Sequence, residues 1–423
     1  MADPYKKVGY PTMPKSLFCR CSPKVYRPGI LARASLWLLL PAVASTAQAA
    51  PADDVYDEIA RIESEQGAFG ASLGEHLLSL ATGYQARGKH VEAVEAFKRA
   101  LHVQRINEGL YSMNQVPAME AMIESQIALG DWDEAAKRHS HMYWLHQRNF
   151  GVDDPRMLPM LEKMSSWHLN AFSLSPVNIA NHLLSAHQLF AMSIDIIDKN
   201  YGREDMQMIK PLKGLAVSNY YLATLKAEQS RRSAMMTTSS NGNDTAQAER
   251  KARLDHYILN SYYNGKQAIT KMIDIYETAD HTDQSDLIAA HVQLGDWYMM
   301  FDRSNAAMGQ YELAFDKIAT TNTLDEFSKE LFDKPHALPD MPLLETQAHN
   351  PNQPHDYVLV KFDVTSRGEA RNVDILESKP ENHVGNRAMV RRSLKSAKFR
   401  PRMVAGKPVD TKGIVHRYIL PKS

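Results

Sequence analysis

Residues 80–100 of this chain read LATGYQARGKHVEAVEAFKRA, a stretch in which two helical patterns flank Gly88. Medium-sized, small, aromatic and turn residues occupy fixed places in it: Leu80, Ala81, Tyr84, Gly88, Ala93, Phe97 and Ala100. The small side chains let two antiparallel helices approach closely, and the aromatic rings fill the spaces beside them. The stretch therefore predicts a helical hairpin with a glycine at its turn.

The same spacing returns further along the chain. Turn glycines and small helix residues recur at an interval of 42 residues, namely Gly67, Gly109 and Gly151, Gly88 and Gly130, and Ala93 and Ala135. A fixed period of this length indicates a repeat architecture, in which each unit buries its apolar face against its neighbours.

Later units keep parts of this pattern. The second unit retains Gly130 and Ala135, and the third retains Ala186 and Phe190 after an insertion of roughly nine residues that Pro176 marks. A late unit fills six positions in order: Leu294, Gly295, Tyr298, Ala307, Tyr311 and Ala314. We read these residues as structural repeat positions.

A further unit is expected between the third and the last. Its two helices are predicted over 212–226 and 257–279, and the segment 230–250 between them is rich in Ser, Thr, Asn and Gln, which predicts a mobile loop. We therefore expect five helix pairs within 50–320, from about Asp53 to Ala319.

The long period and the Gly-x-Asp-Asp-Pro string at 151–155 resemble the extended, kinesin-light-chain-like variety of tetratricopeptide repeats. This resemblance implies an α-solenoid whose concave face binds extended peptides or partner helices, and hence a scaffold. The pattern alone does not separate concave-face contacts from core residues, so no concave-face residue is singled out.

The N-terminal residues 1–49 read as a signal peptide. Basic residues precede the apolar run 36–44, and Ala47-Gln48-Ala49 follows as a cleavage site, with Met1 and Met13 both open as the start. The run is shorter than the roughly 20 residues that span a bilayer, although an uncleaved anchor stays open as the alternative. Both cysteines, Cys19 and Cys21, precede the cut, so the mature chain is expected to have no thiol chemistry and no disulfide.

The C-terminal part changes from helical to strand periodicity. A proline-containing linker is expected over 321–354, followed by a hairpin of 357–364 with 370–377, a helix over 386–398 and a last strand over 414–420. The predicted fold class is therefore mainly α: an α-solenoid of tetratricopeptide-like helix pairs followed by a small α+β domain, 355–423, of β-β-α-β order.

The strings Val-x-Phe-x-Val at 360–364, Phe-Arg-Pro at 399–401 and Gly-Lys-Pro-Val at 406–409 closely resemble the TonB C-terminal domain family. Members of that family bind segments of outer-membrane transporters by adding them as a strand at a sheet edge. By position, the resemblance implies a partner-binding edge formed by Ile414, Val415, His416, Arg417, Tyr418, Ile419 and Leu420. The chain departs from the family in having helical repeats in place of a long proline-rich span.

The charge balance and the motif content exclude several classes of function. The counts of Lys+Arg and of Asp+Glu are both 49, so the global basic field of a general nucleic-acid binder is missing, although the segment Asp356–Ser423 holds 15 basic and 7 acidic residues. No phosphate-binding glycine loop, nucleophile elbow or zinc-type His-Glu-x-x-His is present. The densest group of possible metal ligands is His139, His141, His146 and His168 around Trp144, and of these His139 and His146 share a helix face. A metal site would need further ligands from elsewhere, so we expect neither a metal, a cofactor nor an enzyme.

These observations predict a non-enzymatic protein-protein interaction scaffold of the bacterial periplasm, exported by a cleavable signal peptide. Its expected partners are envelope proteins, including a segment of an outer-membrane receptor, and the cationic face of the predicted helix leaves peripheral membrane contact open. The alternative is a TonB-like energy transducer for transport across the outer membrane of a Gram-negative bacterium, held in the inner membrane by an uncleaved N-terminal segment.

Overall fold

A computed structural model describes residues 52–174, 179–235, 245–279, 283–320, 325–339, 356–380 and 384–420. The predicted signal peptide and Pro176 lie outside these residues. In the part of the chain that is described, no helix is both long and apolar enough to cross a membrane.

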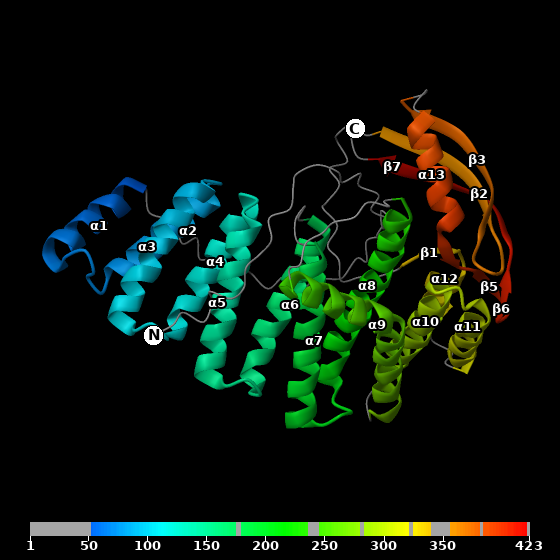
Figure 1. Ribbon diagram of the computed structural model, residues 1–423, viewed down its shortest axis with the longest axis horizontal. Coiled ribbons are helices and arrows are strands. Elements are labelled where there is room, and N and C mark those ends of the chain that lie inside the picture. The colour runs from blue at the N-terminus through cyan, green and yellow to red at the C-terminus, as the bar shows by residue number, and fades with distance from the viewer. Residues whose placement is uncertain are drawn as a thin grey trace.

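Most of the described chain is a row of paired helices. After α1 (Ala52–Gln66) come α2 (Leu73–Ala86) with α3 (His90–Glu108), α4 (Val116–Ala128) with α5 (Trp132–Phe150), α6 (Leu158–Leu174) with α7 (Ile179–Tyr201), α8 (Ile209–Met235) with α9 (Thr245–Thr278), and α10 (Gln284–Met300) with α11 (Ser304–Thr320). Figure 1 shows these helices side by side from α1 to α11. The five predicted pairs are therefore all found among the described residues, and α1 is an additional helix before them.

The turn glycines explain the period of 42 residues. Gly109 and Gly151 follow the last residues of α3 and α5 and have φ angles of 94° and 93°, a conformation that residues with a side chain rarely adopt. After each of them a short 3₁₀ turn leads into the next pair, namely η2 (Met113–Gln115) and η3 (Pro155–Met157). A third turn, η4 (Met206–Met208), does the same before α8.

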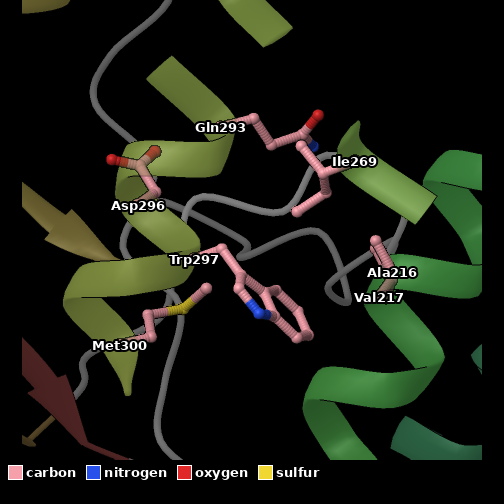
Figure 2. Close-up of a pocket in the computed structure, with 7 residues that line it drawn as sticks. All are labelled: Ala216, Val217, Ile269, Gln293, Asp296, Trp297 and Met300. Atoms are coloured by element: carbon pink, nitrogen blue, oxygen red, sulfur yellow. The ribbon is translucent and has the colours of Figure 1, made fainter. Parts of the chain in front are cut away.

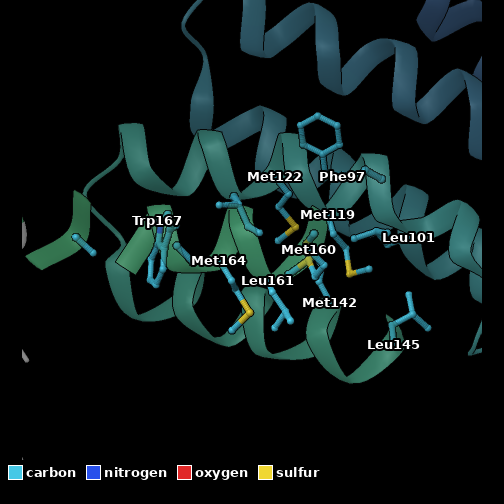
Figure 3. Packing of buried hydrophobic residues seen from close by; sticks show 14 of the residues in the cluster. Phe97, Leu101, Met119, Met122, Met142, Leu145, Met160, Leu161, Met164 and Trp167 are labelled. Atoms are coloured by element: carbon cyan, nitrogen blue, oxygen red, sulfur yellow. The ribbon is translucent and has the colours of Figure 1, made fainter. Parts of the chain in front are cut away.

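Small and flexible side chains fill the core between the first pairs. Ala81, Ala93 and Phe97 are buried there as the repeat pattern predicts. Several methionines pack around them and around the following pair, as Figure 3 shows, including Met119, Met122, Met142, Met160 and Met164. The unbranched methionine side chain adapts to irregular gaps, and this suits units whose sequences have diverged from one another.

Glycine allows the closest contacts in the last two pairs. A Cβ on Gly295 of α10 would lie 2.4 Å from Cε1 of Tyr311 on α11, and a Cβ on Gly265 of α9 would lie 2.1 Å from Cη2 of Trp297 on α10. Both rings are fully buried. The repeat positions Gly295 and Tyr311 thus form one contact, in which the missing side chain makes room for the ring.

The predicted loop over 230–250 was too long. Helix α8 continues to Met235 and α9 begins at Thr245, so helical structure extends into the expected loop from both sides. A helix that is rich in polar residues buries less apolar surface. It can still extend beyond the part that packs against other helices.

The C-terminal strands form small sheets. The largest has the order β3-β2-β7 and is antiparallel, with β2 (Asp356–Val364) between β3 (Ala370–Lys379) and β7 (Thr411–Leu420). Helix α13 (Val384–Ser396) packs on it through Val390 and Leu394, which share a core with Val358, Val360 and Phe362. The predicted β-β-α-β order is present, with three short strands between α13 and β7: β4 (Lys398–Arg400), and β5 (Arg402–Val404) with β6 (Lys407–Val409), which form a hairpin.

The segment 321–354 is not simply a linker. Helix α12 (Asp325–Phe332) and strand β1 (His336–Leu338) lie within it, and β1 pairs with β4 (Lys398–Arg400) next to the sheet. Prolines at 335 and 339 flank β1, where they end the short strand without disturbing its pairing. Residues 340–354 of the predicted linker lie outside the described residues.

Candidate interaction sites at the junction of repeats and sheet

A buried ion pair joins the last helix pair to the C-terminal strands. Arg400 of β4 donates from Nε to Oδ1 of Asp296 on α10 at 2.9 Å and from Nη2 to Oδ2 at 2.5 Å. The side chains are only 4% and 8% exposed. A two-point contact of this kind fixes orientation as well as distance, so β4 is held in one position against α10.

Two further hydrogen bonds complete this contact. The hydroxyl of Tyr311 donates to Oδ1 of Asp296 at 2.8 Å, and Nη1 of Arg400 donates to the carbonyl of Leu331 at 3.2 Å. Burial, together with the nearby charge of Asp296, raises the pKa of Tyr311 well above its usual value, so the hydroxyl keeps its proton. Tyr311 therefore has a second role besides packing its ring in the repeat: its hydroxyl binds Asp296. The repeat pattern did not predict this hydrogen bond.

The apolar core also continues across this junction. Phe332 of α12 and Met403 of β5 are buried in the same cluster as Ala307, Tyr311 and Ala314 of α11. A Cβ on Gly368, in the turn between β2 and β3, would lie 2.1 Å from the backbone oxygen of Phe399. The last helix pair therefore shares a core with α12 and β5, next to the three-stranded sheet, whose own core is a separate cluster.

An open groove of about 390 Å³ lies beside the junction. Its walls come from α9, α10, the following turn and the start of α11, and it is lined by Tyr262, Lys266, Tyr298, Asp302, Arg303, Ser304, Asn305 and Ala306. Arg303 lies over the ring of Tyr262 at 4.7 Å, and Lys266 lies 5.8 Å from the ring centre of Tyr298.

A second pocket near the junction is far too small for a ligand. It lies beside Trp297 and has a volume of about 10 Å³, which is close to the least that one water molecule needs. Figure 2 shows its lining residues, with the indole of Trp297 turned toward α8 and Asp296 turned away from it.

The turn before α11 departs from the repeat pattern. Gly88 and Gly130 stand five residues before Ala93 and Ala135, and Asp302 stands at the same distance before Ala307. Asp302 keeps the left-handed conformation of the glycines, with a φ of 60°, and its carboxylate pairs with Lys398 of β4. Aspartate can adopt this conformation, but at a higher cost in free energy than glycine. The turn before α11 therefore differs from the glycine turns of the earlier pairs.

The predicted partner-binding residues all lie on β7, the last strand of the three-stranded sheet. Phe362, Val360 and Val358 of β2 stand opposite Ile414, His416 and Tyr418, which places these three on the face that packs on α13. Val415, Arg417 and Ile419 alternate with them on the other face, and Val415 is 54% exposed. Leu420 ends the strand opposite Asp356.

Asparagines repeat at the junctions between helix pairs. Asn107, Asn149 and Asn200 each stand two residues before a turn glycine. Each donates from Nδ2 to a backbone oxygen in its own helix and to one in the preceding loop; for Asn149 these are Leu145 at 2.8 Å and Tyr111 at 3.0 Å. The three side chains tie each second helix to the loop before its own pair.

Replacing Asn149 with alanine is expected to lower the free energy of unfolding by about 1 kcal/mol, because it removes two hydrogen bonds between neutral groups that are partly exposed. The triple replacement at 107, 149 and 200 should lower it by about 3 kcal/mol, since the sites are far apart and their effects add. Urea unfolding followed by circular dichroism measures both. Gln188→Ala, on the exposed face of α7, is the control and should change little; an equal loss there would contradict this role.

Three histidines gather around one tryptophan between α5, α6 and α7. The rings of His139, His168 and His182 lie 4.5, 4.8 and 5.3 Å from the ring of Trp167, and Nδ1 of His168 lies 3.0 Å from Nδ1 of His182. The sequence had suggested His139, His141, His146 and His168 around Trp144. Instead, His141 stacks on Trp144, and Nδ1 of His146 donates to the Met142 carbonyl.

Among the described residues, no group of three or more His, Cys, Asp or Glu side chains is arranged so that it could hold a metal ion. Burial lowers the pKa of His139 to about 4 and also lowers that of His182, where Asp133 partly opposes the effect. Burial and the charge of His182 lower the pKa of His168. All three histidines are therefore held in the neutral form.

The stability of the chain should therefore fall in mild acid. As the pH falls below about 6.5, the unfolded chain binds protons on these histidines more readily than the folded chain does, so the free energy of unfolding decreases. For His139, whose pKa is lowered to about 4, we expect a loss of about 2 kcal/mol from pH 7 to pH 5, and His168 and His182 change the stability in the same direction. Urea unfolding at both pH values tests this, and His139→Phe should reduce the loss because it keeps a ring against Trp167 without a titrating group. An unchanged loss in that variant would refute the assignment.

Comparison with known proteins gives structural neighbours only. No protein-family model and no curated protein matches the chain. Among solved structures, one of nearly identical TPR-like repeats of a Podosopora anserina kinesin light chain is 13% identical, with a TM-score of 0.38, and covers 59% of this chain and 96% of that one. BtubC (BKLC) from P. vanneervenii is also 13% identical, with a TM-score of 0.35, and covers 65% and 91%.

Sequence reasoning missed the main residues of the junction. Arg400 was read only as part of the Phe-Arg-Pro string, and Asp296 went unnoticed although it lies within a buried run of α10. An acidic residue beside Gly295 and Trp297, in an otherwise apolar stretch, was the available signal. The Asn-x-Gly spacing at the ends of α3, α5 and α7 was the signal for the asparagines.

Proposed function

We propose that this chain is a non-enzymatic protein-protein interaction scaffold of the bacterial periplasm, in which the helix pairs bind one partner and the C-terminal domain docks another by strand addition at β7. The observation that carries the proposal is the continuous row of five helix pairs, joined through the buried contact of α10 with β4 to the C-terminal strands, among which β7 is an edge strand of the three-stranded sheet. Stacked helix pairs offer a long surface of the kind that binds extended segments.

The proposal for β7 rests on its position and on the resemblance to the TonB C-terminal domain. Strand addition uses main-chain hydrogen bonds for affinity and alternate side chains for specificity. Val415, Arg417 and Ile419 would provide these alternate contacts on one face of the sheet.

Site-specific photo-cross-linking tests the docking. The full chain is produced in a Gram-negative host with a photoreactive amino acid in place of Val415 or, as a control, of Val91, which is 60% exposed on α3. We expect a discrete cross-linked envelope protein at Val415 and a different pattern at Val91. The same products at both positions, or none at Val415, would contradict docking at β7.

Fractionation with intact-mass measurement tests the proposed compartment. A soluble periplasmic species that begins near Ala50 supports the scaffold. A full-length species bound to the inner membrane would instead favour the TonB-like energy transducer.

A further inference from the structure

The outer face of α13 carries a concentration of positive charge. Its sequence holds three arginines, one lysine and no acidic residue, and among the α-helices that the structure describes it is the one that lacks both Asp and Glu. All four cationic side chains are exposed: Arg387, Arg391, Arg392 and Lys395. Three of them, Arg387, Arg391 and Lys395, follow at intervals of four residues and so form a row along one side of the helix.

This row has no acidic partner in the part of the chain that the structure describes. The ion pairs of the C-terminal strands use other basic residues, namely Arg371, Lys398 and Arg400. On the repeats the same helical spacing carries opposite charges, as where Lys199 pairs with Asp195. Like charges four residues apart on a helix repel each other, so the row destabilises α13 unless an anionic surface outside the chain faces it.

The position of α13 leaves this face open. The apolar side of the helix packs on β2 and β3 through Val390 and Leu394. Figure 1 shows α13 over the sheet at the end of the row of helices. In the sheet order β3-β2-β7, the open edge of β7 lies on the side away from β3. A surface that contacts α13 therefore need not cover the strand edge that is proposed for docking.

The shape of the face favours an extended anionic surface. From Arg387 to Lys395 the row extends about 12 Å along the helix, which is more than one phosphate or carboxylate group spans. A protein partner would be expected to anchor on large apolar or aromatic side chains. On α13 the one exposed side chain of this kind is Val384, which is 78% exposed. Anionic phospholipid headgroups instead offer many negative charges in one plane, to which exposed Lys and Arg are attracted.

We propose that the outer face of α13 binds a membrane surface rich in anionic phospholipid. The four cations contact headgroup phosphates, and Val384 in the first turn of the helix reaches between the headgroups. Long Lys and Arg side chains can do this while the helix itself stays outside the lipid. The inference goes beyond the scaffold function, because it gives the chain a membrane contact that does not depend on residues 1–49.

Co-sedimentation of the full chain with vesicles tests this contact. One set of vesicles contains phosphatidylcholine with a minor part of phosphatidylglycerol, and the other contains phosphatidylcholine alone. We expect at least tenfold stronger binding to the vesicles with phosphatidylglycerol, and a difference that shrinks as salt is added, because salt screens exposed charges. Equal binding to both sets would overturn the proposal.

A matched pair of variants locates the binding. The first variant should bind the anionic vesicles at least tenfold more weakly and carries Arg387→Gln, Arg391→Gln, Arg392→Gln and Lys395→Gln. The control removes the same total charge from exposed lysines of the repeats that pair with carboxylates: Lys98→Gln, Lys137→Gln, Lys163→Gln and Lys210→Gln. The control should bind as the unchanged chain does. An equal loss in both variants would mean that net charge alone drives binding, and the site on α13 would be refuted.

A charge-conserving variant separates charge from side-chain shape. Arg387→Lys, Arg391→Lys and Arg392→Lys together keep every positive charge and should keep most of the binding, because headgroup attraction depends on charge. Circular dichroism of each variant checks that the helices are retained. A loss as large as in the glutamine variant would point to a ligand that recognises arginine geometry and would contradict the headgroup assignment.

Two further arms test the class of partner. Soluble polyglutamate and isolated peptidoglycan are offered to the unchanged chain and to the glutamine variant of α13. Binding of either through α13, without binding to the anionic vesicles, would overturn the membrane assignment. Photo-cross-linking at Val415 is independent of these arms, so a discrete product there without vesicle binding would remove the membrane contact and keep the scaffold.

Discussion

Replacing Arg400 with methionine is expected to lower the free energy of unfolding by about 3–5 kcal/mol, because it leaves the carboxylate of Asp296 buried without its partner. Methionine fills much of the space of the arginine side chain's methylene groups. Most of the loss of stability therefore comes from the unpaired buried charge of Asp296, and little comes from a cavity. Tyr311 would keep its hydrogen bond to Asp296, which compensates only in part. Urea unfolding followed by tryptophan fluorescence measures the change, since Trp297 lies next to Asp296.

The double variant provides the control. Asp296→Leu combined with Arg400→Met removes both charges and should recover most of the lost stability, because a buried ion pair is often replaceable by apolar residues of similar volume. A double variant as unstable as Arg400→Met alone would show that packing, and not the unpaired charge, causes the loss.

Replacing Trp297 with alanine should cost about as much, roughly 3–5 kcal/mol, because the largest fully buried side chain of the described core would leave a cavity. The facing Gly265 has no side chain that could fill the space, so α9 and α10 would have to move together to close it. Urea unfolding followed by circular dichroism at 222 nm measures the loss without depending on the tryptophan.

Trp144→Ala is the control for this variant. Trp144 lies only partly buried, between Tyr111 and His141, so its replacement should cost clearly less. If both variants lost the same free energy of unfolding, the two rings would contribute equally to stability. The close contact of Trp297 with Gly265 would then add nothing to it.

The repeat pattern predicted the helix pairs well because it reflects local packing. Ala93, Phe97 and Ala135 are buried in the first core, Ala186 and Phe190 in a later one, and Ala307 and Ala314 in the last, as their spacing indicated. Such contacts join residues of neighbouring helices, so a short stretch of sequence contains both partners.

The junction could not be predicted in the same way. Arg400 and Asp296 are 104 residues apart, and neither belongs to a repeating pattern that would point to the other. A charged residue on a helix is ordinarily read as facing solvent, which is why the partner of Arg400 was not found. The linker over 321–354 was predicted from its prolines, which end helices but are compatible with a short strand such as β1.

The shared core at α11, α12 and β5 also decides how the row of helices ends. A stack of identical pairs would present an apolar face at its last member, ready to take up another pair or a second molecule. Here Phe332 and Met403 cover that face, and Arg400 satisfies the carboxylate that would otherwise be buried at it. The C-terminal strands therefore act as the terminal cap of the solenoid, so a chain cut after residue 320 should lose solubility as well as the sheet, and the array has a defined length.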